Sequence, residues 1–383
     1  MQHLVYAVAF LSSLGQSLVA LAMPLMAIER FGALNFHLGL LAACGSGLYT
    51  VMALISGHVS ERLPARFHLP GCTFVLAVSY YLMFHVPSFT ALILLNLLNG
   101  MTTGLLWAPI EGVLSRLSSP ARMRRNVGRY NLSWSLGMAA GFYLFSHITQ
   151  MAFQVGAALV FATGLMLLFL RAPHAGWRPD DETCKGAARR GDPYHRFFLM
   201  IAWSGLFAAY VGVAAVRQLF PKLITELSIS PAVMGRVYGI GVVAQTIAMA
   251  SMGRFEGWHY RKEAFFVGGI GMFIGTMIIA LGRVPVVFAV GHVVVGIGMA
   301  ILYSCSLYYS MRDPAHAHHN TSVHEAMIGT AATTPVLLGF LADRAHFTPL
   351  SFYIAAAVAL GLLAVHLILF ARAAPRRATE RED

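Results

Sequence analysis

Charged residues are scarce in this sequence. Aspartate, glutamate, lysine and arginine make up 11% of the 383 residues, whereas 57% of the residues are hydrophobic. A soluble domain has about 25% charged residues, which help to cover its surface in water. The composition therefore predicts an integral membrane protein, and so high an apolar content also excludes intrinsic disorder.

Cysteine pairs and nucleotide-binding motifs are also lacking. The four cysteines, Cys44, Cys72, Cys184 and Cys305, are far apart, which argues against a disulfide framework and a structural zinc site. No Gly-x-x-x-x-Gly-Lys-Ser/Thr stretch is present that would bind ATP. The first apolar run, 4–28, is too long for the core of a signal peptide, so we interpret it as a membrane span.

Long apolar runs are abundant. A helix needs about 20 apolar residues to cross a bilayer, whereas the strands of a membrane barrel alternate over about 10 residues. Twelve continuous runs occur, and they predict an all-α membrane protein with twelve transmembrane helices. The predicted spans are 4–28, 37–57, 69–86, 89–115, 130–149, 152–171, 197–220, 232–253, 264–282, 285–311, 320–342 and 349–371.

The basic residues predict the orientation of these spans. The net charge is +11, with 27 basic and 16 acidic residues. If the N-terminus is cytoplasmic, 21 of the 27 basic residues fall at the inner ends and loops and 6 at the outer ones. Because cytoplasmic loops are enriched in Lys and Arg, we expect both termini to be cytoplasmic. We expect the membrane to be a bacterial inner membrane. The same pattern assigns the positive charge to topology, so we expect lipid and no nucleic acid as a partner.

The longest polar stretch divides the spans into two sets of six. We predict an N-terminal six-helix bundle at 1–171, a cytoplasmic linker at 172–195, a C-terminal bundle at 196–372 and a cytoplasmic tail at 373–383.

An internal repeat relates the two sets. A shift of 196 residues takes Gly39 to Gly235 and Gly57 to Gly253. The same shift takes Arg66 to Lys262, Gly100 to Gly296 and Arg116 to Arg312. Parallel repeats of this kind place the substrate path between two bundles, near the middle of the membrane.

The loop between spans two and three resembles a family motif. It reads Gly57-His58-Val59-Ser60-Glu61-Arg62-Leu63-Pro64-Ala65-Arg66. This is similar to the Gly-x-x-x-Asp-Arg-x-Gly-Arg-Arg motif of the major facilitator superfamily, and the 253–262 stretch is a weaker second copy. The resemblance implies that family's fold, two six-helix bundles related by a pseudo-two-fold axis, and a gating role for Gly57, Glu61, Arg62 and Arg66. Packing and topology alone are the alternative explanation for these residues.

Two departures from the family's exporters are informative. Span four reads Asn96-Leu97-Leu98-Asn99-Gly100. At this place many proton-driven drug exporters of the family carry a motif similar to Arg-x-x-Gln-Gly. In span five, Gly141 is followed by Phe142 instead of the exporters' proline. Both departures disfavour a drug/proton antiporter.

Polar and aromatic residues within the spans are candidates for substrate binding, because polar groups in a bilayer usually face a cavity or one another. Arg217 can grip a carboxylate or phosphate with two donors, or it can lie at the membrane interface. Asn96 and Asn99 share a helix face, where they can bind a ligand or join helices. The predicted substrate-binding residues are Asn96, Asn99, Trp107, Trp134, Tyr210, Arg217, His292 and Tyr303.

Three residues are candidates for proton coupling. His292, the repeat counterpart of Asn96, can titrate near neutral pH. Glu325 can carry a proton or form a static salt bridge across the bundle interface, and we include Arg129 among the gating residues as a possible partner. Glu111 is the third candidate, although we expect Arg116 and Arg129 to hold it ionised.

Histidines His316, His318 and His319 follow span ten, but no acidic or thiol partner is clustered beside them. We therefore expect a solvated loop, with no metal and no cofactor.

Together these patterns predict a monomeric secondary active transporter and no enzyme. It would move a small polar or anionic metabolite by alternating access with proton coupling. Efflux of amphiphilic compounds and a non-transporting membrane sensor or scaffold remain open as alternatives.

Overall fold

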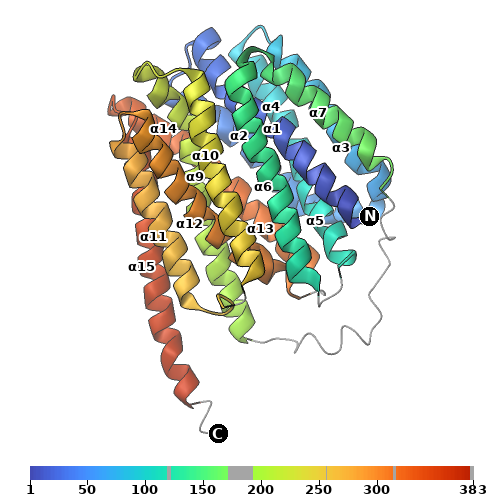
Figure 1. Ribbon diagram of the computed structural model, residues 1–383, viewed down its shortest axis with the longest axis vertical. Helices are drawn as coiled ribbons and strands as arrows, with labels where there is room; N and C mark the ends of the chain where they lie inside the picture. Colours follow the sequence, from blue (N-terminus) through green and yellow to red (C-terminus); the bar gives the residue numbers. More distant parts are fainter. Residues whose placement is uncertain (119–121, 171–192, 256, 314–315, 380–383) are drawn as a thin grey trace.

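The computed structural model describes residues 1–118, 122–170, 193–255, 257–313 and 316–379. Every regular element in these ranges is a helix (Figure 1). Eleven segments of the described chain are long and apolar enough to cross a membrane. One of them, Arg125–Leu167, holds two helices that run in opposite directions, so the twelve predicted spans are all represented.

The first half of the chain is defined here as the helices before residue 171. Its elements are α1 (Gln2–Phe31), α2 (Asn35–Arg62), α3 (Ala65–Phe84), α4 (Phe89–Gly104), α5 (Trp107–Arg116), α6 (Met123–Ile148), the short 3₁₀ helix η2 (Thr149–Met151) and α7 (Ala152–Leu167).

The second half contains the helices after residue 192. Its elements are α9 (Pro193–Glu226), α10 (Pro231–Arg254), α11 (Lys262–Leu281), α12 (Pro285–Met311), α13 (Ala317–Ala331), α14 (Pro335–Arg344) and α15 (Leu350–Thr379).

Two predicted spans are broken in their middle. Span four is divided into α4 and α5 at Leu105, and span eleven into α13 and α14 after Ala331. Both breaks lie four residues before a proline, Pro109 or Pro335. Proline has no N–H to donate to the carbonyl four residues earlier, and its ring clashes with that carbonyl. Each of these two predicted spans therefore consists of two helices that meet at a break.

The predicted linker and tail stay predictions, and the helices next to them extend into both ranges. Most of 172–195 lies outside the described residues, but α9 already begins at Pro193. Helix α15 continues to Thr379, well into the predicted tail at 373–383. In Figure 1 the start of α1 and the end of α7 lie at the right, about half-way down, and the start of α9 and the end of α15 lie at the bottom, so these four ends face the same lower side of the slanted bundle. We call this the terminal end and the opposite one the far end.

The repeat glycines explain how helices meet within and between the halves. A Cβ on Gly39 of α2 would clash with Pro335 of α14, and a Cβ on Gly235 of α10 would clash with Phe142 of α6. These are the two main contacts between the halves, α2 with α13 and α14 and α6 with α10. Within the halves, Gly100 meets Gly45 as its counterpart Gly296 meets Gly241. The pseudo-two-fold relation of the two six-helix bundles follows from these pairs.

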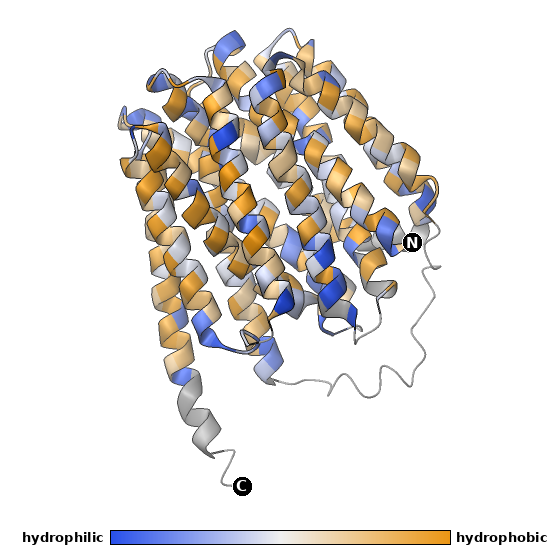
Figure 2. Cartoon of the chain, viewed as in Figure 1, coloured by the Kyte–Doolittle hydropathy of each residue, from blue (hydrophilic) through white to orange (hydrophobic). Residues whose placement is uncertain are grey.

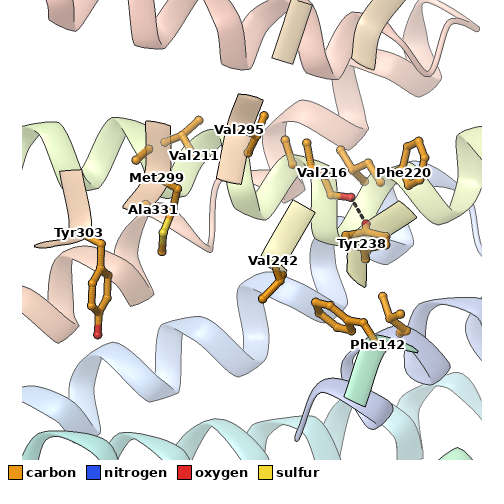
Figure 3. Close-up of a cluster of buried hydrophobic side chains, with 14 of the residues drawn as sticks. Phe142, Val211, Val216, Phe220, Tyr238, Val242, Val295, Met299, Tyr303 and Ala331 are labelled. Carbon is orange, nitrogen blue, oxygen red and sulfur yellow. Dashed lines mark hydrogen bonds between the residues drawn. The ribbon is translucent and has the colours of Figure 1, made fainter. Parts of the chain in front are cut away.

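Apolar side chains cover most of the outer helix faces, and hydrophilic residues gather at the two ends (Figure 2). Large exposed residues such as Leu94, Ile247 and Val286 can contact lipid without a hydration cost. Inside, the buried apolar cluster crosses between the halves. Figure 3 shows Phe142 of α6 beside Tyr238 of α10, with ring centroids 5.4 Å apart and the Tyr238 hydroxyl donating to the Val216 carbonyl at 2.7 Å.

A polar clasp joins the halves at the far end. The first backbone N–H groups of α2, from Asn35 and Phe36, donate to the two carboxylate oxygens of Asp343 on α14 at 3.2 and 2.7 Å. The Asn35 side chain also donates to Asp343 at 2.9 Å and to Thr348 at 3.0 Å. Thr348 in turn donates to Glu226 at 2.9 Å. A carboxylate from the second half thus caps the positive N-terminus of a helix in the first half.

We expect Asp343→Asn to loosen the far end. The amide keeps the size of the side chain but removes the negative charge from the helix N-terminus. Loss of a helix cap costs about 0.5–2 kcal/mol, which corresponds to a shift of about 2- to 30-fold toward conformations with α2 and α14 apart. Spin labels at Leu34 and Phe347 would report the distance. Arg344→Gln, at the neighbouring exposed residue, is the matched control, and equal distance distributions in all three proteins would rule out the clasp.

The predicted orientation can be tested by labelling from outside the cell. In a background with the four native cysteines replaced by alanine, Asp180→Cys should stay unlabelled by an impermeant maleimide. Ser230→Cys, at the exposed far-end start of α10, should react. The opposite result would reverse the topology.

Candidate functional site

A cavity of about 300 Å³ lies between the two halves. Helices α1 to α6 of the first half line it, together with α9, α12 and α13 of the second. Seven of the eight predicted substrate-binding residues lie on its wall, namely Asn96, Asn99, Trp107, Trp134, Tyr210, Arg217 and Tyr303. The tertiary structure therefore brings residues from separate spans into one site.

Two carboxyl groups meet on this wall. Glu111 comes from α5 in the first half and Glu325 from α13 in the second, and they lie within hydrogen-bonding range of each other. Their side chains are almost fully buried, with Glu111 1% and Glu325 4% exposed. Two ionised carboxylates repel at such a distance, so a proton shared by the pair would stabilise this contact.

Hydroxyl and imidazole groups surround the carboxyl pair. The Tyr49 hydroxyl of α2 donates to Glu325, and the Tyr130 hydroxyl of α6 lies in hydrogen-bonding range of Glu111. His324 shares a hydrogen bond with Ser306 at 2.8 Å, while its other ring nitrogen, Nε2, lies 4.0 Å from Glu325. The pair therefore has polar partners in both halves.

The expected arginine partner of these acids is not found. Arg129 is exposed and forms no ion pair with Glu111 or Glu325 within the described residues. The side chain of Arg116 lies outside the described part of the structure. The structure therefore shows no Arg–Glu bridge from Glu325 to Arg129 among the described residues, and the gating role of Arg129 stays a prediction.

Arg217 of α9 is half-buried on the same cavity wall. Its guanidinium donates to the sulfur of Met138 on α6 at 3.7 Å, which is a weak acceptor. No carboxylate of the described residues lies within 4.0 Å of it. Most of its donors are therefore left for water or for a ligand.

Of the two asparagines, Asn96 joins α4 to α2, whereas Asn99 bonds within α4. Asn96 donates to the Leu41 carbonyl of α2 at 2.7 Å, and Asn99 donates to the Asn96 side chain at 3.2 Å. Both border the cavity. Because the Asn96 amide is already held by the Leu41 carbonyl, Asn99 is better placed to contact a ligand.

Aromatic side chains form the middle of the cavity. Trp134 and Tyr303, from opposite halves, have ring centroids 5.3 Å apart at an angle of 59°. Trp107 and Tyr210 lie on the same wall. The repeat counterparts Trp107 and Tyr303 thus face one cavity from the two halves.

His292 does not line the cavity. Its ring is enclosed by Phe220 and Tyr238, with centroids 4.9 and 4.8 Å away, and its Nδ1 bonds to the Phe288 carbonyl at 2.8 Å. It packs against Gly241 as its counterpart Asn96 packs against Gly45. The predicted role of His292 in substrate binding and proton coupling is not supported by this position, because the repeat relation reflects helix packing.

The predicted gating residues lie at the terminal end. Gly57, Glu61 and Arg62 belong to the last turns of α2, and their side chains lie outside the described part of the structure. Arg66 is exposed and lies 4.7 Å from the Phe67 ring centroid. Their gating role stays a prediction.

The histidines after α12 do not form a metal site in the described part of the chain. His316 is exposed and pairs with Asp313 at 2.7 Å, and no group of three metal-binding side chains is found among the described residues. The side chain of His318 is not described.

Three further residues on the cavity wall, Tyr49, Tyr130 and Gln16, were not predicted from the sequence. Each is a common residue type within a long apolar helix, and no periodicity shows which face meets the other half. The four-residue spacing of Tyr130, Trp134 and Met138 was the available signal, since it places all three on one face of α6.

Comparison with known families agrees with this architecture. The family model of the Major Facilitator Superfamily matches residues 5–332. The chain belongs to this superfamily. A superfamily of membrane transporters accounts for the membrane spans, the two bundles and the cavity between them. No curated sequence matches the chain significantly.

Solved structures of superfamily members share the fold. A mutant of the nucleoside transporter NupG aligns with a TM-score of 0.73 and 14% identity, covering 96% of this chain and 99% of that one. NupG itself gives 0.72 and 13%, with 96% and 98% covered. The human organic anion transporter MFSD10 (TETRAN) gives 0.70 and 15%, with 95% and 98% covered. At such low identities the likeness concerns the fold alone.

Proposed function

We propose that this protein is a proton-coupled secondary active transporter of a small polar or anionic metabolite, working by alternating access. One observation carries the proposal. The same cavity holds a cationic arginine without a carboxylate partner among the described residues and a carboxyl pair contributed by both halves.

Arg217 supports an anionic substrate. A guanidinium within the membrane is costly unless it has a partner, and the described residues offer it only the Met138 sulfur. A carboxylate or phosphate fits its forked donors best. A substrate that carries this group would supply the missing partner.

The carboxyl pair supports proton coupling. Glu111 and Glu325 belong to different halves, so a shared proton holds α5 and α13 together. When the proton leaves, two negative charges face each other in a site of low dielectric constant, and the halves are driven apart. Protonation is thereby linked to the relative position of the halves, which is the movement that alternating access requires.

The orientation and the gating loop belong to the same proposal. The 21-to-6 distribution of basic residues and the common position of the chain ends support cytoplasmic termini in a bacterial inner membrane. Glu61 and Arg62 at the end of α2 would then control closure at the cytoplasmic side. We expect the protein to act as a monomer, since the cavity is complete within one chain.

Counterflow into proteoliposomes tests the proposal. Purified protein in liposomes loaded with a mixed metabolite pool should take up trace amounts of one anionic species from the outside. Uptake inhibited only by apolar cations would favour efflux of amphiphilic compounds instead. Absence of any exchange by a monodisperse protein would overturn transport and favour a sensor or scaffold.

A further inference from the structure

One face of α6 orders the contents of the cavity. Tyr130, Trp134 and Met138 follow one another at four-residue intervals, and all three line the cavity. Each interval advances a helix by about 6 Å. These side chains form a ladder along the cavity, from the terminal end toward the far end.

Each step of this ladder has a different partner from another helix. Tyr130 lies beside Glu111 of the carboxyl pair. Trp134 contacts the Tyr303 ring with centroids 5.3 Å apart, and Met138 accepts from Arg217 at 3.7 Å. The cavity is therefore acidic at one step, aromatic at the next and cationic at the third.

The spacing restricts the substrate. Two steps separate Arg217 from the carboxyl pair, about 12 Å along α6. An amino acid carries its two charges on adjacent parts of a small molecule, so it cannot reach both. One step, about 6 Å, separates the guanidinium from the aromatic pair. A charge-assisted hydrogen bond of about 2.8 Å and a carboxyl group fill this distance.

The aromatic side chains at the middle position of the ladder fit a flat apolar group of the ligand. Trp134 and Tyr303 are inclined to each other by 59° and form one contacting pair, against which a further ring can pack from the cavity. Tyr210, one heptad before Arg217 on α9, lies within electrostatic range of both Arg217 and the carboxyl pair and borders the same space. Trp107 adds a fourth aromatic side chain. Ring pairs prefer offset or edge-to-face contacts of this kind.

The volume limits the ligand to a small one. Ligand sites in proteins have volumes of about 300–1,000 Å³. The cavity of about 300 Å³ lies at the lower end of this range, which fits a single ring with a short acidic group.

We propose that the substrate is a planar aromatic monocarboxylate, with its carboxylate at Arg217 and its ring packed against the cavity side of the Trp134–Tyr303 pair. This inference rests on the proposed function for the statement that the bound molecule is transported. The binding geometry stands independently of proton coupling. The carboxyl pair lies one step beyond the ring, so proton and substrate occupy separate places and can be bound together.

Equilibrium binding to the purified full-length protein in nanodiscs tests the inference with three probes. Benzoate is the expected ligand, cyclohexanecarboxylate keeps the charge without the flat ring, and benzamide keeps the ring without the charge. We expect benzoate to bind about fivefold or more tightly than cyclohexanecarboxylate, as ring contacts contribute a preference of this order. Benzamide should bind at least tenfold more weakly than benzoate.

Two variants assign the contacts. Trp134→Leu should remove the preference for benzoate over cyclohexanecarboxylate, and Arg217→Gln should weaken both carboxylates alike. The ratio of the benzoate and cyclohexanecarboxylate affinities is measured in the unaltered protein. It therefore tests the inference even if a variant fails to fold.

The outcomes separate this inference from transport itself. Equal affinity for benzoate and cyclohexanecarboxylate, or no binding of either, would overturn the aromatic substrate. Counterflow of another anion in the same preparation would then leave the proposed function standing. Tight benzoate binding with no exchange in proteoliposomes would overturn transport and keep the binding site.

Discussion

Replacing Glu325 by glutamine should abolish proton-driven accumulation of substrate while substrate exchange continues. The amide keeps the hydrogen bond from Tyr49 but cannot take up and release a proton. An imposed pH gradient then has no group through which to act on the halves. The measurement is accumulation in proteoliposomes under a proton gradient, compared with exchange at equal pH on both sides. Glu111→Gln should have the same effect, because the two carboxyl groups share one site.

His292→Gln is the informative control. It replaces an intramembrane histidine that lies outside the cavity, so accumulation should persist. If His292→Gln lost proton-driven accumulation and Glu325→Gln kept it, the proton carrier would be His292 and not the carboxyl pair. Accumulation that follows a sodium gradient and ignores pH would contradict proton coupling altogether.

Arg217→Lys should weaken binding of an anionic substrate by about tenfold or more. A hydrogen bond to a charged group contributes about 1.5–3 kcal/mol, and lysine loses the forked, two-donor geometry. The positive charge is retained, so a purely electrostatic attraction would survive the change. Equilibrium binding of the counterflow substrate to the purified protein would measure the difference.

Arg236→Lys provides the matched control for Arg217. Arg236 lies on α10, is exposed and does not line the cavity. The same substitution there should leave the affinity unchanged. Equal affinities for all three proteins would assign Arg217 to the membrane interface instead of the binding site.

The broken spans show where sequence reasoning about the fold was incomplete. Apolar content predicts that 89–115 and 320–342 cross the membrane, and both do so. Hydropathy is summed over a window, however, and it does not register the missing N–H of Pro109 or Pro335. The prolines were visible in the sequence, but a proline alone does not locate a break, because Pro24, Pro70 and Pro221 lie inside the continuous helices α1, α3 and α9.

The repeat predicted equivalent positions but not equivalent roles. Asn96 and His292 do pack against equivalent glycines, Gly45 and Gly241. Only Asn96 borders the cavity, because the ring of His292 is enclosed by Phe220 and Tyr238. Helix packing is set by small residues that recur with the repeat. The neighbours that surround each side chain differ between the halves, and the shift of 196 residues says nothing about them.

The sequence by itself determined the solvent, the number of spans, the division into two related sets and most of the polar residues that face the cavity. These properties depend on composition and local pattern, because each apolar run must satisfy its own backbone within the bilayer. Only the tertiary structure decided which of those polar residues meet. Glu111 and Glu325 are far apart in the sequence, in different halves of the chain. Their contact depends on how α5 and α13 lie against each other across the interface. Contacts between distant helices are set by the packing of all the others, which no local pattern records.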